Sequence, residues 1–326
     1  MLQKKREGGQ PVDNYIPRLT ELAEDNISFS DGDLLGGWQK TDGDGWTMGS
    51  LFTQMGGIPW AFPVEANSMG DHTKIASGLT TLGDLLKQDG YRQIFLCGSD
   101  GSFAGRADFF QQHGEYEIHD HGYAMSKGYI PDGYNVWWGY EDEYLFEIAK
   151  RELLELSSEG QTFNYTMLTV DTHHIGGYIC DLCGNEYDEP LANVIACCDR
   201  QVAEFVEWCK NQDFYENTVI VICGDHPRMD TILVDGASED DRTIYNCFLN
   251  AVSAEQALPH QKNRDFMAMD MMPTVLAALG FDIEGDRLGL GTNLFSGRKT
   301  LAEELGVEEL KSELSKYSQY YVEHFY

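Results

Sequence analysis

Positive charge is scarce in this sequence of 326 residues. Lysine and arginine together number 23 against 54 aspartates and glutamates, which leaves a net charge of −31 at pH 7. A field of this sign opposes binding to phosphate backbones, so we expect no nucleic acid partner. It also opposes simple electrostatic docking on anionic lipid, although a local aromatic rim is compatible with membrane contact.

Long hydrophobic runs are absent as well. No stretch of about 18 apolar residues occurs, and the opening MLQKKREGGQPVDNY is charged without an apolar core, so neither a spanning helix nor a signal peptide is visible. We expect these 326 residues to be soluble, with any membrane anchor encoded upstream of them. Hydrophobic residues make up 42% of the sequence and aromatic residues 12%, enough for a large globular core.

Helical and strand-like patterns alternate along the chain. Three helical segments, at 80–91, 141–160 and 199–217, each lead into an apolar run. The runs are QIFLCGSD, FNYTMLTVDTHH and TVIVICGDH. Such repeated helix-then-strand units predict an α/β fold with a mostly parallel central sheet and helices on both faces.

Polar residues follow each of the three predicted strands, where open α/β sheets bind their ligands. They are Ser99, Asp100 and Arg106; Asp171, Thr172, His173 and His174; and Asp225 and His226. Taken singly, an aspartate at such a place is often a helix cap and a histidine an ordinary side chain. Three such groups at one sheet edge instead predict a ligand-binding site. Within this site, Asp225 and His226 are suitable ligands for a divalent cation such as Mn²⁺ or Zn²⁺.

A single threonine, Thr47, stands where a glycine-rich turn meets a helix-compatible segment in DGDGWTMGSLFTQMGGIPW. Its hydroxyl either caps that helix or acts as a nucleophile, because metal coordination and a helix N-terminus both favour the alkoxide. The flanking glycines would let the backbone approach a phosphate, and Gly49 would keep the turn uncrowded.

The stretches GWTMGSLFTQMGGIPW, TVDTHH and VIVICGDH, in this order, resemble the phosphoglycerol transferase I and lipoteichoic acid synthase family of the alkaline phosphatase and sulfatase superfamily. The likeness continues through DGYRQIFLCGSDGSFAGRADFFQQHG, WWGYEDEYLF and MDMMPTVLAALGFD and covers roughly residues 15–295. It implies an alkaline-phosphatase-like catalytic domain at 15–300. A flexible segment at 1–14 would precede that domain, and a helical segment at 301–326 would follow it.

The resemblance also implies a role for each matching residue. Thr47 matches the catalytic nucleophile and a ligand of one divalent cation, commonly Mn²⁺ with Mg²⁺ or Zn²⁺ as alternatives. Asp225 and His226 match two further metal ligands. Arg106 matches the arginine that binds the substrate phosphate, and His173 matches a histidine that binds substrate and assists catalysis. His174 is a second candidate for substrate binding.

Two departures from the family pattern qualify these roles. Cys97 and Ala104 stand where lipoteichoic acid synthases carry a histidine and a tryptophan, which affects the expected contacts to glycerol phosphate. The family's first core strand, whose glutamate is a metal ligand, is expected just before Met1 and is not in the sequence. We therefore interpret the chain as a fragment and expect it to bind the cation weakly.

Cysteines crowd into one short segment as Cys180, Cys183, Cys197 and Cys198, while the other four are single and are expected to be buried. The cluster fits either zinc or disulfides. Because the usual second C-x-x-C is lacking, we expect disulfides, namely Cys183 with Cys197 and also Cys180 with Cys198. Disulfides would agree with a protein that functions outside the cytoplasm, because they persist in oxidising compartments.

The resemblance predicts transfer of phosphoglycerol from phosphatidylglycerol to a glycan or glycerol-phosphate acceptor through a covalent threonine intermediate. It places the full-length protein at the extracytoplasmic face of the bacterial cytoplasmic membrane, in contact with lipid. The alternatives are a phosphodiesterase, a sulfatase-like hydrolase, and a truncated inactive relic that binds glycans. The sequence lacks the C-x-P-x-R and S-x-P-x-R motifs of formylglycine sulfatases, which counts against the sulfatase.

Overall fold

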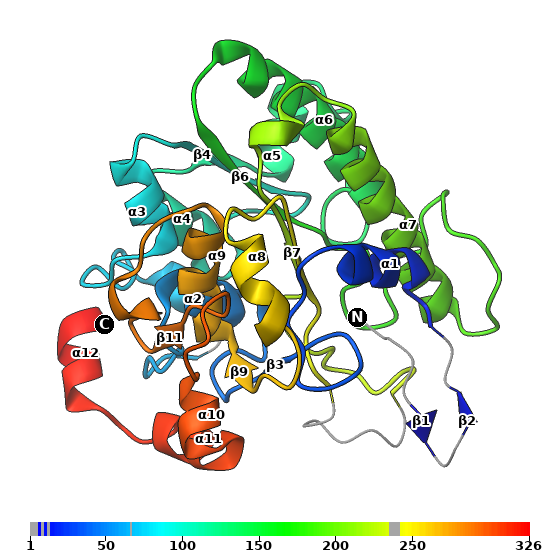
Figure 1. Cartoon of the computed structure of the whole chain (residues 1–326). Coiled ribbons are helices and arrows are strands. Elements are labelled where there is room, and N and C mark those ends of the chain that lie inside the picture. Colours follow the sequence, from blue (N-terminus) through cyan, green and yellow to red (C-terminus); the bar gives the residue numbers. More distant parts are fainter. Residues whose placement is uncertain (1–5, 8–9, 12–13, 66, 235–241) are drawn as a thin grey trace. The chain divides into compact units, whose positions relative to one another are not determined.

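The computed structural model of the chain describes residues 6–7, 10–11, 14–65, 67–234 and 242–326. Most of the predicted segment at 1–14 therefore lies outside the described residues. The chain divides into two compact units: one comprises Met1–Pro63 with Gln212–Tyr326, and the other comprises Val64–Asn211. Figure 1 labels their helices and strands. Among the described helices, none is both long and apolar enough to span a bilayer.

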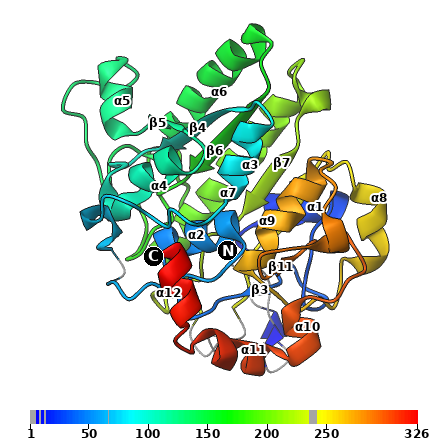
Figure 2. The same ribbon diagram turned by 90° about the vertical axis from the view of Figure 1, so that its left-hand side faces the viewer.

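The second unit contains a sheet of three parallel strands in the order β5-β4-β6. Its strands are β4 (Arg92–Cys97), β5 (Glu117–His119) and β6 (Phe163–Leu168), and they lie side by side in Figure 2. Ile94 of β4 is paired with Glu117 on one side and with Tyr165 on the other. The parallel pairing confirms the α/β prediction, and β4 and β6 fall within the predicted apolar runs.

Helices cover both faces of this sheet. Successive residues of a strand point to opposite faces. Phe95 stacks on Phe110 of the helix α4 with ring centroids 4.1 Å apart, whereas Leu96 packs with Leu145 and Ala149 of the helix α6. The helices of the unit are α3 (Leu82–Gln88), α4 (Arg106–Gln112), α5 (His121–Ser126), α6 (Asp142–Glu159) and α7 (Pro190–Lys210).

The long helix α7 begins earlier than the sequence pattern predicts. The apolar periodicity pointed to 199–217, but Pro190 occupies the first helical turn and the Glu189 side chain accepts a hydrogen bond from the Leu191 N–H at 3.3 Å. Proline at this position favours helix initiation because its missing N–H has no intrahelical partner to lose. The helix ends at Lys210, and a separate short turn follows at Tyr215–Asn217.

The first unit combines short strands with helices, of which α2 (Thr47–Gly56) and α9 (Met271–Ala278) are largely buried. Strand β7 (Ile220–Cys223) pairs antiparallel with β8 (Asn246–Leu249), and β3 (Trp38–Gln39) pairs parallel with β9 (Phe266–Met267). Two hairpins join β1 (Arg6–Glu7) to β2 (Gln10–Pro11) and β10 (Arg287–Leu288) to β11 (Gly291–Thr292). The other helices are α1 (Pro17–Asp25), α8 (Ala254–Ala257), α10 (Leu301–Leu305), α11 (Val307–Leu314) and α12 (Gln319–Phe325).

Aromatic side chains form the centre of this unit's core. Phe29, Phe248 and Phe295 meet edge to face with ring centroids 5.3 to 5.9 Å apart. Trp38 and Phe266, from the paired strands β3 and β9, belong to the same buried cluster. Each such aromatic pair adds about 0.5–1.5 kcal/mol beyond the area that it buries. The core thus binds together segments from both ends of the sequence.

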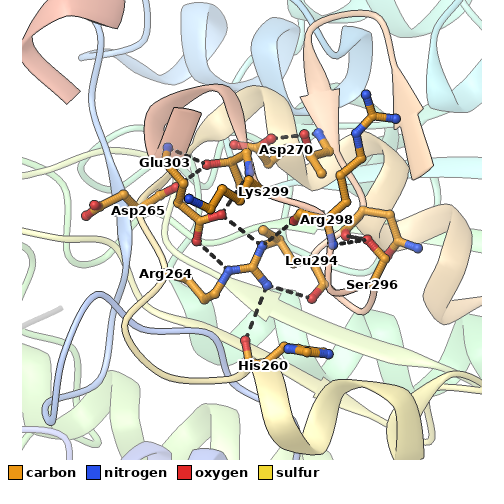
Figure 3. Close-up of polar contacts among 12 residues, drawn as sticks. His260, Arg264, Asp265, Asp270, Leu294, Ser296, Arg298, Lys299 and Glu303 are labelled. Atoms are coloured by element: carbon orange, nitrogen blue, oxygen red, sulfur yellow. Dashed lines mark hydrogen bonds and ion pairs between the residues drawn. The ribbon is translucent and has the colours of Figure 1, made fainter. Parts of the chain in front are cut away.

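A buried arginine organises the C-terminal part of the first unit, as Figure 3 shows. Arg264 donates to Glu303 of α10 through Nε at 2.6 Å and through Nη2 at 3.4 Å. Its remaining hydrogen bonds go to the carbonyl oxygens of His260, Leu294 and Arg298 at 3.3, 3.1 and 3.0 Å. Only 6% of Arg264 is exposed, so one buried guanidinium donates hydrogen bonds to a carboxylate and to three backbone carbonyl oxygens.

Candidate active site

Thr47 is the first residue of α2. The preceding Trp46 is extended, with φ −153° and ψ 154°, and the helix ends at Gly57, whose φ of 64° is left-handed. Glycine favours this C-terminal conformation because it has no Cβ. The Thr47 hydroxyl is therefore presented at the N-terminus of a ten-residue helix, where the aligned peptide dipoles favour negative charge.

Two glycines allow the turn before α2 to pack tightly. A Cβ on Gly49 would lie 2.1 Å from the carbonyl oxygen of Gly43 and 2.6 Å from Nε1 of Trp46. A Cβ on Gly43 would lie 1.9 Å from the carbonyl oxygen of Trp60. Both positions exclude any larger residue, so these glycines hold the Thr47 turn in place by close backbone packing. The predicted approach of this backbone to a phosphate stays a prediction.

Three predicted site residues converge at the carboxyl end of β7. Thr47 Oγ1 donates to Asp225 Oδ2 at 3.0 Å and lies 3.4 Å from His226 Nε2. Asp225 Oδ2 and His226 Nε2 are 3.3 Å apart. The three side chains thus meet within about 5 Å, as expected for residues at a strand end. The N-cap residue of this helix is Trp46, and the Thr47 hydroxyl does not cap the helix but is hydrogen-bonded to Asp225.

The His226 ring has a defined orientation. Nδ1 lies 2.9 Å from the carbonyl oxygen of Pro227, which can only accept, so Nδ1 carries the hydrogen. In the neutral ring Nε2 then presents its lone pair to Asp225 Oδ2, which is also an acceptor. A cation shared by Nε2, Oδ2 and the Thr47 oxygen would relieve this contact between acceptors. The donor set of one imidazole, one carboxylate and one hydroxyl therefore fits a divalent metal.

A chain of polar side chains holds the backbone of Asp225. The Ser50 hydroxyl donates to the Asp225 carbonyl oxygen, and Gln54 Nε2 donates to Ser50 Oγ at 2.9 Å. Cys223 Sγ in turn donates to Gln54 Oε1 at 3.2 Å. The sequence patterns did not predict Ser50 and Gln54. Their spacing of three and seven residues from Thr47 places them on the same helix face, which is the signal that identifies them.

Arg106, in the second unit, begins α4 and is fixed by its own loop. Its Nη2 donates to Ser99 Oγ at 3.0 Å and to the Asp100 carbonyl oxygen at 2.8 Å. Burial lowers the pKa of its guanidinium. Cys97, one of the two departures from the family pattern, is buried beneath, and burial raises the pKa of its thiol to about 11. It is thus a neutral packing residue at physiological pH.

Aromatic rings connect Arg106 with the two predicted histidines. The Arg106 guanidinium lies 5.5 Å from the centre of the Phe103 ring, and Phe103 contacts Trp138 with centroids 5.6 Å apart. Trp138 contacts His173 at 4.8 Å, and His173 stacks on His174 at 4.5 Å. Phe103 and Trp138 remain 44% and 41% exposed. The structure therefore brings Arg106, His173 and His174 into one partly open aromatic patch, in which Phe103 and Trp138 were not predicted.

Asp171 points into the protein. It is 3% exposed, and its Oδ2 accepts from the Asp142 N–H at 3.2 Å, while the Asp142 carboxylate accepts from the backbone N–H groups of Val170 and Asp171. Burial and the neighbouring Asp142 raise the pKa of Asp171 to about 8, and burial raises the pKa of Asp142 to about 6. This acid pair fixes the start of the loop that carries His173.

The expected disulfides are absent, because all eight cysteines are free. Cys180 Sγ lies 3.7 Å from Cys183 Sγ and 3.8 Å from Cys197 Sγ, so three sulfurs form a triangle in place of the predicted pairs. Cys198 does not join them. It is buried, and burial, followed by the charges of Asp142 and Asp171, raises the pKa of its thiol.

Curated relatives are named phosphoglycerol transferase I. The one from Xanthomonas campestris pv. campestris is 34% identical over 241 residues, which cover 72% of this chain and 33% of the relative. The one from Salmonella choleraesuis is 30% identical over 303 residues, covering 91% and 38%. The chain thus spans about a third to two-fifths of the length of these relatives.

Solved structures share the fold at lower identity. The lipoteichoic acid synthase LtaP from Listeria monocytogenes aligns with a TM-score of 0.71 at 16% identity, over 99% of this chain and 89% of that one. An alkaline phosphatase superfamily protein from Vibrio parahaemolyticus aligns with a TM-score of 0.64 at 21% identity, over 89% and 66%. These alignments confirm the predicted alkaline-phosphatase-like architecture.

A family model described as sulfatase matches residues 8–281. Proteins of this superfamily generally use a divalent metal, in agreement with the donors that meet at Thr47. By the extent of this match, which covers most of the sequence, the chain belongs to the sulfatase family.

Proposed function

We propose that this chain is the catalytic domain of a metal-dependent phosphoglycerol transferase. It would move phosphoglycerol from phosphatidylglycerol to a glycan or glycerol-phosphate acceptor through a covalent intermediate on Thr47. The observation that carries the proposal is the placement of Thr47 Oγ1 at 3.0 Å from Asp225 Oδ2 and 3.4 Å from His226 Nε2, at the start of a helix. The relatives named phosphoglycerol transferase I supply the substrate class.

Thr47, Asp225 and His226 would hold one divalent cation, with Mn²⁺ as the first candidate and Mg²⁺ or Zn²⁺ as alternatives. When bound, the cation supplies Lewis acidity that favours the threonine alkoxide and offsets charge on the phosphoryl oxygens. Asp225 and His226 are oriented for this by Ser50 and Pro227. If an upstream glutamate belongs to the natural site, binding by residues 1–326 alone is weak.

In the first half-reaction Thr47 Oγ1 would attack phosphorus, and the proton of its hydroxyl would pass by way of solvent to the leaving oxygen, because Asp225 Oδ2, to which that hydroxyl donates at 3.0 Å, would be a ligand of the cation. The bond from phosphorus to the diacylglycerol oxygen breaks, and that oxygen takes up a proton. By the family resemblance, Arg106 would bind the substrate phosphate and offset the charge on its oxygens. Diacylglycerol leaves, and a glycerophospho-threonine remains.

In the second half-reaction an acceptor hydroxyl attacks the same phosphorus, the bond to Thr47 breaks, and the threonine hydroxyl is restored. By the family resemblance, His173 would hold the transferred group or assist the proton transfer from the acceptor, and His174 is a second candidate for substrate binding. The domain would comprise residues 15–300, with the helices α10 to α12 in the C-terminal segment 301–326. The full-length protein would act at the extracytoplasmic face of the cytoplasmic membrane, where the lipid donor lies.

The test compares Thr47→Ala with Thr218→Ala, both in this chain and in any longer natural protein that contains it. Thr218 is a matched control because it precedes the amino end of β7, whereas Asp225 follows the carboxyl end, and its hydroxyl donates to the Phe214 carbonyl oxygen at 2.8 Å. With phosphatidylglycerol vesicles and Mn²⁺, Thr47→Ala should reduce diacylglycerol release by more than about a thousandfold, and Thr218→Ala by less than about twofold. Mass spectrometry without acceptor should find glycerophosphate on Thr47.

Other outcomes decide among the alternatives. Thr47→Ala activity within about tenfold of wild type would refute the covalent mechanism. Release of free glycerophosphate in the presence of acceptor glycans would identify a phosphodiesterase, and turnover of sulfate esters alone would identify a sulfatase. Glycan binding without turnover in the full-length protein would identify an inactive relic.

A further inference from the structure

Three cysteine sulfurs of the second unit gather where the loop between β6 and α7 meets that helix. Cys180 and Cys183 come from a tight turn in which the Cys183 N–H donates to the Cys180 carbonyl oxygen at 3.1 Å, and Cys197 comes from α7. The sulfurs all lie within 4.8 Å of one another. No other group of three or more histidine, cysteine or acidic side chains with this spacing occurs among the residues that the structure describes.

The distances between the sulfurs match a metal site. Tetrahedral Zn²⁺ with Zn–S bonds of about 2.3 Å requires sulfurs about 3.8 Å apart. Cys180 Sγ lies 3.7 Å from Cys183 Sγ and 3.8 Å from Cys197 Sγ. A disulfide, in contrast, would join only two of the three sulfurs and would leave the third unpaired.

Two N–H groups donate hydrogen bonds to sulfurs of the cluster. The backbone N–H of Leu182 donates to the Cys180 sulfur, and Gln201 Nε2 donates to Cys197 Sγ at 3.4 Å. Such N–H to sulfur hydrogen bonds are the usual support around metal-bound cysteines. Cys180 and Cys197 are buried, whereas Cys183 is partly exposed and leaves a route from solvent.

We infer that Cys180, Cys183 and Cys197 bind a soft divalent cation, Zn²⁺ in the first place, at a three-thiolate site separate from the Thr47 centre. Sulfur ligands select Zn²⁺ over Mn²⁺ and Mg²⁺, which prefer oxygen. On binding, each thiol releases its proton as a Zn–S bond forms, and water takes the fourth tetrahedral position.

The site would fasten a functional loop to a helix. Residues 169–189 contain no helix or strand and carry His173, and three contacts dock this loop on α7. One contact is the cysteine cluster; Asn193 exchanges hydrogen bonds with the Tyr187 backbone at 3.0 and 2.8 Å, and Arg200 donates to the Leu182 carbonyl oxygen at 3.0 Å. A bound cation makes the cysteine contact the strongest of the three and limits the motion of the loop.

The test measures zinc after purification of the whole chain under reducing conditions without chelators. We expect about one Zn²⁺ per chain in wild type and less than about 0.2 in Cys183→Ser. Cys209→Ser is the matched control, because Cys209 is a single buried cysteine of the same helix. It should retain the metal, and so should Asp225→Ala, which disrupts only the Thr47 centre.

Cobalt gives an independent readout. Co²⁺ added to the metal-free chain should produce thiolate-to-metal charge-transfer absorption, which oxygen and imidazole ligands do not give. The absorption should be lost in Cys183→Ser and kept in Asp225→Ala, so failure of the proposed catalytic centre and failure of this site are distinguishable. Wild type without zinc and with three reduced thiols, a disulfide between any two of them, or equal loss of metal in Cys209→Ser would each overturn the inference.

Discussion

Replacing Arg264 by methionine tests how much one buried guanidinium contributes to the first unit. The substitution keeps most of the apolar volume and removes every hydrogen bond that Figure 3 shows for this side chain. Glu303, with 14% of its side chain exposed, loses its guanidinium partner, and three backbone carbonyl oxygens lose a donor. The Glu303 carboxylate keeps its hydrogen bond from the Thr300 N–H at 2.8 Å.

The magnitude follows from the burial of the ion pair. Removal of one partner of a buried pair costs about 3–5 kcal/mol, because the other charge is left without compensation. Arg287→Met is the matched control: Arg287 pairs with Glu304, the neighbour of Glu303 on α10, at 3.1 Å, but that glutamate is 40% exposed. An exposed pair contributes about 0–1 kcal/mol.

Urea unfolding followed by circular dichroism measures both variants. With an m-value on the order of 3 kcal/mol per molar urea, Arg264→Met should lower the first unit's midpoint by about 1–1.7 M and Arg287→Met by less than about 0.3 M. Combining Arg264→Met with Glu303→Gln should recover part of the loss, because the buried charge is then removed. Equal destabilisation by the two single variants, or no recovery in the double variant, would refute the argument from burial.

Three further predictions concern the site and its supports. Ser50→Ala should weaken divalent-cation binding at the Thr47 centre by about 10-fold in calorimetric titration, because the Asp225 backbone loses its hydroxyl donor. Gly49→Ala should fail to fold or lose several kcal/mol in thermal unfolding, since the new Cβ would lie 2.1 Å from a backbone oxygen. Asp171→Asn should reduce the pH dependence of stability. Burial raises the pKa of Asp171 from 3.8 to about 8 and that of Asp142 to about 6, so the stability that this pair contributes is fully present below about pH 4 and is lost as pH rises through this window. In urea titrations between about pH 5 and pH 9, the variant should lose roughly 1–3 kcal/mol less than wild type.

The sequence predicted those parts of the fold that depend on local periodicity. The strands β4, β6 and β7 and the helices α3 and α6 lie within the predicted segments, because their apolar residues follow the period of the element they form. The start of α7 was wrong by nine residues, since its first turns are fixed by Pro190 and by burial against the loop before it. The antiparallel partner of β7 is the strand at residues 246–249, and no local sequence pattern predicted this pairing.

The residues of the candidate site that come directly after a strand were predictable from the sequence. Asp225 and His226 come directly after β7, so their meeting with Thr47 followed from strand topology and the family resemblance. Asp171 stands at the same kind of place after β6 but turns inward to Asp142, because the Asp142 and Val170 backbone N–H groups satisfy the acid pair. The triangle of three cysteine sulfurs was not predicted. One of its sulfurs comes from a helix, and the usual zinc pattern of two C-x-x-C pairs does not include such a residue.

The order in which the ribosome delivers the chain sets a constraint on the first unit. Thr47 and Asp225 are 178 residues apart in sequence, and the whole of Val64–Asn211 is made between them. At a translation rate of about 5–20 residues per second, Thr47 waits roughly 10–35 s before its partner has been synthesised. The second unit, which is continuous in sequence, can fold during that interval. In residues 14–63, apolar side chains such as Phe29 and Trp38 must wait for core partners that are synthesised later. Chaperone dependence during synthesis should therefore concentrate on the N-terminal segment.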